Sequence, residues 1–119
     1  MYKIPLNLDL TKIVGCVATQ ILVGQFDIQF SFGEVRFVVQ SRIDLVRDDQ
    51  IIGSWREGRW PDSQFYEVMN TNVLGYKIPT ERELVIYLSN EISMHLHDDS
   101  DQFECIRIAI EGEKSEWVI

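Results

Sequence analysis

Two histidines one residue apart are the side chains best placed to do chemistry in this sequence of 119 residues. On a strand, His95 and His97 would point to one face about 6–7 Å apart. That spacing could hold a divalent metal if a third ligand came from a neighbouring strand. A solvated strand face explains the same pattern, because Ile92, Met94 and Leu96 alternate with the histidines. We expect no metal and no cofactor, and keep a small metal- or ligand-binding β-barrel using His95 and His97 as the alternative function.

The remaining reactive residues do not form a catalytic group. Cys16 and Cys105 lie far apart in apolar surroundings without CxxC spacing, so they fit two buried thiols, although a disulfide stays open. The sequence contains no GxSxG, GxxxxGK[ST] or GxGxxG motif. The paired carboxylates at 48–49 and 98–99 fall in predicted turns, where carboxylates are ordinarily solvated. We therefore expect a protein that is not an enzyme.

Two tryptophans are more informative. Trp55 and Trp60 stand with Arg56 and Arg59 on a segment without periodicity, which predicts a loop, and Tyr66 is nearby. These residue types dominate the energetic centres of protein interfaces. The rings could instead cap the open end of a β fold, and the sequence does not separate the two interpretations.

The charge is concentrated in the C-terminal third. Eleven Lys and Arg against 19 Asp and Glu give a net charge of -8, of which residues 81–119 carry -7 (ten acids, three bases). Such a balance opposes nucleic-acid binding, which rests on basic residues. A local negative patch would steer a basic protein partner, although solubilising charge explains it equally. The acids predicted to contact that partner are Asp98, Asp99, Asp101, Glu111 and Glu113.

Apolar residues alternate with polar ones through most of the chain, which predicts β-strands. Phe26 to Phe32 alternates with a period of two, and after the Gly33 turn Val35 to Val46 continues as one long return strand. Between the two halves, Phe65, Val68 and Met69 have helical spacing after Pro61. The prediction is a mainly β (α+β) fold with one short helix.

The second half of the sequence repeats the first. Val14-Gly15 is echoed by Leu74-Gly75, and the strand that begins at Phe26 is echoed by the strand that begins at Leu84. We predict a single domain over residues 1–119, with internal repeats at about 13–53 and 73–119. Two antiparallel β-meander repeats would then form a sandwich or a partly open barrel, with the short helix between them.

The sequence contains no apolar run of signal-peptide or membrane-span length. This predicts a cytoplasmic protein that does not enter a membrane. We expect a monomer or a weak dimer.

The second half resembles a family of small bacterial proteins of unknown function built of two glycine-led β repeats. Asn90 stands where that family usually has a turn glycine, and the residues that carry the resemblance are Leu74-Gly75, 83–90, His97-Asp98-Asp99 and Phe103-Glu104. In size and charge the chain is also similar to immunity proteins of contact-dependent toxin systems. That resemblance implies a non-enzymatic inhibitor that binds and neutralises a basic toxin domain, commonly a nuclease.

Overall fold

The structure is a computed structural model, which describes residues 3–99, 105–112 and 116–119. Within these ranges the chain forms short 3-10 helices (η) and β-strands. In chain order they are η1 (Thr11–Ile13), β1 (Ala18–Val23), β2 (Ile28–Phe32), β3 (Val35–Val39), β4 (Ile43–Arg47), β5 (Gln50–Trp55), η2 (Ser63–Val68), β6 (Val73–Thr80), β7 (Glu83–Leu88), β8 (Ser93–His97), β9 (Ile106–Ile110) and β10 (Glu116–Val118).

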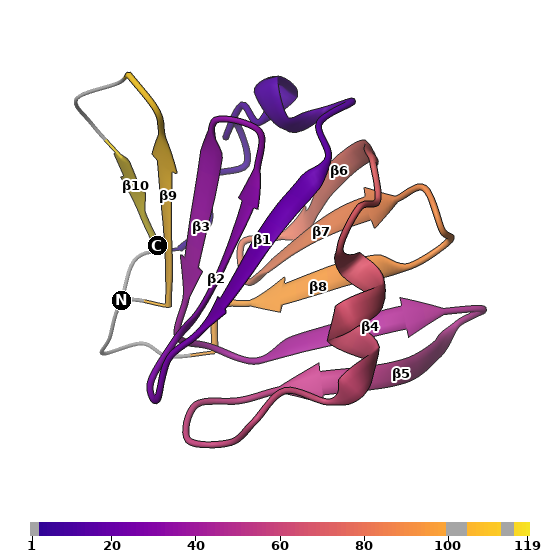
Figure 1. Cartoon of the computed structure of the whole chain (residues 1–119). Helices are drawn as coiled ribbons and strands as arrows, with labels where there is room; N and C mark the ends of the chain where they lie inside the picture. The colour runs from indigo at the N-terminus through magenta and orange to yellow at the C-terminus, as the bar shows by residue number, and fades with distance from the viewer. Residues whose placement is uncertain (1–2, 100–104, 113–115) are drawn as a thin grey trace.

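The strands form two antiparallel sheets, which confirms the mainly β prediction (Figure 1). One sheet has the order β1-β2-β3-β9-β10 and the other β5-β4-β8-β7-β6. Each sheet therefore combines three strands from one half of the chain with a hairpin from the other half. The two halves are interleaved rather than packed as separate units.

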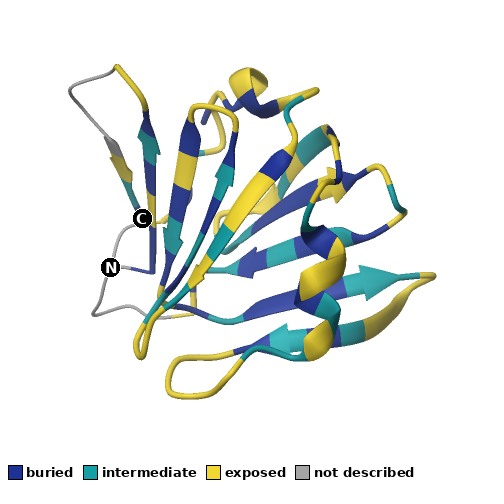
Figure 2. Ribbon diagram, in the orientation of Figure 1, coloured by how far each residue is buried: buried dark blue, intermediate teal, exposed yellow. Residues whose placement is uncertain are grey.

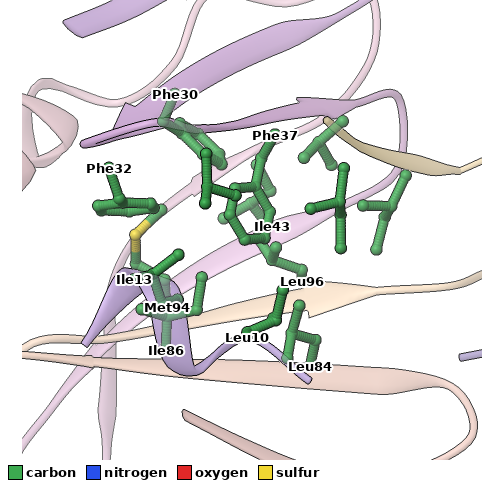
Figure 3. Close-up of a cluster of buried hydrophobic side chains, with 14 of the residues drawn as sticks. Leu10, Ile13, Phe30, Phe32, Phe37, Ile43, Leu84, Ile86, Met94 and Leu96 are labelled. Carbon is green, nitrogen blue, oxygen red and sulfur yellow. The ribbon is translucent and has the colours of Figure 1, made fainter. Parts of the chain in front are cut away.

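The core lies between the sheets. Alternate side chains point inward from each strand, including Phe30 and Phe37 from one sheet and Ile86 and Met94 from the other (Figure 3). The Phe32 and Phe37 rings meet edge to face, with centroids 5.7 Å apart. Figure 2 shows the resulting alternation of buried and exposed positions along the strands.

The predicted long strand from Val35 to Val46 is two strands, β3 and β4, which belong to different sheets. The chain changes sheet at residues 40–42, where the Gln40 N–H donates to the Cys105 carbonyl. Val35, Val39 and Ile43 stay buried throughout. The prediction of one strand was wrong because the period of two continues unbroken across the change of sheet.

The predicted short helix is present as η2, in 3-10 rather than α form. Phe65 and Val68 are its buried residues, and they join the core. Asn70, with φ of +65°, follows the helix and reverses the chain toward β6. The helix thus connects β5 of one hairpin to β6, as Figure 1 shows.

The junctions before β1 and β6 have the same hydrogen bonds. The Gly15 N–H donates to the Val73 carbonyl, and the Asn70 N–H donates to the Ala18 carbonyl. Gly15 (φ +84°) and Asn70 (φ +65°) thus occupy equivalent positions, whereas the sequence comparison matched Gly15 with Gly75. The strand orders of the two sheets also correspond, with β1-β2-β3-β9-β10 in one matching β6-β7-β8-β4-β5 in the other. The origin of this likeness in a duplication stays a prediction.

Within the described residues Cys16 and Cys105 are not joined in a disulfide, and Cys105 is buried. The described part of the chain has no helix of the length and apolarity that crossing a membrane requires.

Candidate functional site

Trp55 is not on a loop. It is the last residue of β5, where it pairs with Ile43 and points into the core with 0% of its surface exposed. The prediction of Trp55 as an exposed partner-binding residue was wrong, because pairing with β4 places this large ring on the inner face. For Trp55 to contact a partner, its ring would have to leave the core and expose the interior between the two sheets.

Trp60, unlike Trp55, is exposed. It has 77% of its surface accessible, and Tyr66 on η2 has 82%. The two rings border a groove of about 400 Å³ between η2 and β1, with Ile21, Val23 and Phe65 on its walls. The exposed walls of this groove are mainly apolar.

The segment that carries Trp60 is tied down at several points. The Gly58 N–H donates to the Gln25 carbonyl over 3.2 Å. The Ser54 N–H donates to Asp62 Oδ2 over 2.9 Å, and Asp62 Oδ1 is paired with Arg59 at 3.3 Å. These contacts hold the loop between the β1–β2 turn and β5, so Trp60 is presented from an anchored segment.

Asp98 is buried rather than exposed, with 0% of its side chain accessible. Its N–H donates to the Arg82 carbonyl, which extends the ladder between β8 and β7 by one residue. Its carboxylate lies 3.6 Å from the Arg82 guanidinium and has no hydrogen-bond partner in the described structure. The prediction that Asp98 contacts a partner was wrong, because strand alternation turns it inward.

The other predicted acids are not gathered into one patch by the described residues. Asp99 follows β8 near residues 40–42, whereas Glu111 lies beside Glu34 at the opposite end of β3. The length of β3 separates these ends by roughly 15 Å. Asp99 and Glu111 are both exposed, and Asp101 and Glu113 lie outside the described residues.

His95 and His97 lie on the outer face of β8, and both are hydrogen-bonded to neighbours. His95 Nδ1 is 3.1 Å from Glu83 Oε2, and His97 Nε2 is 3.1 Å from Asp44 Oδ2. Ser93 Oγ is 3.0 Å from His95 Nε2. Among residues 3–99, 105–112 and 116–119, no three His, Cys, Asp or Glu side chains converge to hold a metal.

The contacts of Ser93, His95 and Glu83 follow the order of a nucleophile, a base and an orienting carboxylate, which sequence inspection missed because Glu83 comes from another strand. Such a group also needs free N–H donors for a developing oxyanion. Here β8 lies between β4 and β7, so its backbone N–H groups are used in the two ladders. We interpret the group as a structural network.

Comparisons with protein-family models, with curated proteins and with solved structures gave no significant match.

Proposed function

We propose that this chain is a non-enzymatic inhibitor of the immunity type, which binds a basic bacterial toxin domain and neutralises it in the cytoplasm. The observation that carries the proposal is the pair of exposed rings, Trp60 and Tyr66, which line an apolar groove. Tryptophan and tyrosine are the residues most enriched at the energetic centres of protein interfaces. An exposed apolar site of this kind is unfavourable for a protein that binds nothing.

Charge has a different role in this proposal. The net charge of -8 favours a basic partner, such as a nuclease domain, and raises its rate of association through long-range attraction. Asp99 and Glu111 are exposed but lie at opposite ends of the fold. We therefore assign steering to the acidic surface as a whole and docking to the Trp60 groove.

The test is affinity capture of the tagged protein from its native cell lysate, at low and moderate salt. The protein is captured both alone and with the neighbouring upstream genes co-expressed. A stoichiometric basic partner that is toxic alone and harmless in the complex is the expected result. An absence of any stoichiometric partner at either salt concentration would contradict the proposal.

The docking face is tested with two tryptophan variants. Trp60→Ala should weaken the partner's affinity by about 30-fold, which corresponds to about 2 kcal/mol for a residue at an interface centre. Trp117→Ala is the matched control, since Trp117 is also exposed but lies on β10, at the opposite edge of the same sheet. Equal affinities for the two variants would remove Trp60 from the interface.

A further inference from the structure

β1 is an edge strand with backbone groups left free. Phe32 and Val35 flank a two-residue turn, so Phe32 directs its backbone groups toward β3. Alternate residues of a strand bond to opposite neighbours, so Ser31 and Gln29 of β2 bond instead to β1, at Gln20 and Leu22. The N–H and C=O groups of the intervening residues, Ile21 and Val23, then point away from the sheet. In the described structure these groups have no hydrogen-bond partner.

This edge also lacks the features that normally prevent strand pairing. Residues 17–23 contain no charged residue and no proline. The equivalent edge strand, β6, carries Lys77 and Pro79. β5 is the opposite edge of the sheet that contains β6, and there the N–H and C=O of Ser54 are bonded to Asp62. Of the edge strands β1, β5 and β6, β1 is the one whose backbone groups and side chains permit pairing with another strand.

The groove lies directly beside the free side of β1. A strand added there would place its alternate side chains between Ile21 and Val23 on one wall and Trp60, Phe65 and Tyr66 on the other. Main-chain bonds to an edge strand, with pockets for alternate side chains, are an established mode of peptide recognition.

The residues that line the groove indicate which side chains a bound segment would carry. Seven residues before the equivalent residues Gly15 and Asn70 stand Leu8 and Ser63, of which Leu8 precedes η1 and Ser63 begins η2. Leu8 is buried in the core, whereas Ser63 is exposed and lines the groove. The exposed walls of the groove are mainly apolar, with Ile21, Val23 and Phe65 among them, so aliphatic side chains are the ones that fit it.

We propose that an extended segment of the partner pairs with β1 as a sixth strand and inserts aliphatic side chains at alternate positions into the groove. This proposal rests on the proposed function and specifies the form of the protein it binds. The depression beside β6 is a contrast, because the charged side chains of Asp9 and Lys77 line it together with Leu6, Leu8 and Ile78. An apolar segment is therefore expected at β1 and not at β6.

The probe is a capped heptapeptide with valines alternating with threonines between terminal lysines, titrated into the full-length protein and followed by NMR. We expect saturable shifts at Ile21, Val23 and the Trp60 indole, with a dissociation constant of about 1 mM or tighter. Exchange of the Ile21 and Val23 amides should slow by about tenfold at saturation. Of two control peptides, N-methylated on either alternate set of amides, one should lose binding.

The protein variants test the groove itself. Ser63→Leu places a larger aliphatic side chain in the groove and should weaken peptide binding by at least about tenfold. Asn7→Leu, beside β6, is the matched control and should leave the affinity unchanged. Unchanged shifts at Ile21 and Val23 in millimolar peptide would overturn the proposal. So would shifts confined to β6, or a dimer in sedimentation that Val23→Pro abolishes, since the occupant would then be a second copy.

The two proposals fail separately. A captured toxin that depends on Trp60 but binds Val23→Pro with wild-type affinity would overturn strand addition and leave the inhibitor function standing. Peptide binding at β1 without any captured partner would support strand addition and contradict the inhibitor function.

Discussion

Asp44 offers the sharpest test of how the outer face of the second sheet is held together. Its side chain is 9% exposed and accepts a hydrogen bond from Ser54 Oγ at 2.8 Å. The same carboxylate lies 3.1 Å from His97 Nε2 and 3.2 Å from Arg42 Nε. One carboxylate therefore connects β5, β4 and β8. Asp44→Ala would remove all three contacts together.

The cost follows from these contacts. A hydrogen bond to a charged group contributes about 1.5–3 kcal/mol, and the contacts of Asp44 with Ser54 and His97 are of this kind. The Arg42 side chain is 38% exposed, so solvent screens its share to under about 1 kcal/mol. We expect Asp44→Ala to lower the free energy of unfolding by about 3 kcal/mol. Asp44→Asn, which keeps an acceptor for Ser54, should cost about half as much.

Urea unfolding followed by tryptophan fluorescence measures this difference. With a slope of about 2 kcal/mol per molar urea, the midpoint of Asp44→Ala should fall by about 1.5 M. Asp99→Ala is the matched control, because Asp99 is exposed and its loss should change stability by less than about 0.5 kcal/mol. A loss below about 1 kcal/mol for Asp44→Ala would show that the network contributes little to the fold.

Three further outcomes are expected. Trp55→Ala should cost about 3–5 kcal/mol in the same unfolding assay, whereas Trp60→Ala should cost less than about 0.5 kcal/mol, since only the first ring is buried. The pKa of Asp9 is lowered by hydrogen bonds from the Thr11 N–H and hydroxyl. This contact stabilises the fold above the carboxyl's unfolded pKa and is lost as the pH falls through its folded value, so an NMR titration of Thr11→Val should give an Asp9 pKa closer to the ordinary one. Gly33→Ala should lower the thermal midpoint, at a cost of about 1–3 kcal/mol, because Gly33 has φ of +60° and a Cβ there would lie 2.8 Å from a neighbouring sulfur atom.

The strands were predictable because their signal is local. Alternation around Phe30 and Leu84 identifies strands and their buried faces without knowledge of their neighbours. The assignment of strands to sheets was not predictable in this way. At residues 40–42 the chain passes from one sheet to the other, while Val39 and Ile43 both stay buried. The alternation of apolar and polar residues is therefore the same as in one continuous strand, and it does not indicate the change of sheet.

The candidate site was only partly predictable for a related reason. Trp55 and Trp60 are five residues apart in similar composition, yet one is buried and the other exposed. The difference depends on the pairing of Trp55 with Ile43, which is a long-range fact. Asp98 shows the same dependence. It begins a run of acids that is typical of a turn, yet its N–H continues the ladder between β8 and β7 by one residue.

The internal likeness of the two halves separates what the fold requires from what it does not. His97 and Gln40 are equivalent, since the His97 N–H donates to the Arg42 carbonyl as the Gln40 N–H donates to the Cys105 carbonyl. Gln40 is exposed and His97 belongs to the Asp44 network, so the fold tolerates either side chain there. Leu8 and Ser63 also differ, because Leu8 is buried beside the depression at β6 whereas Ser63 is exposed in the groove at β1. The groove beside β1 adjoins an edge strand with unused hydrogen bonds, whereas the depression beside β6 adjoins a strand that carries Lys77 and Pro79, so a peptide that adds a strand to this fold should select β1.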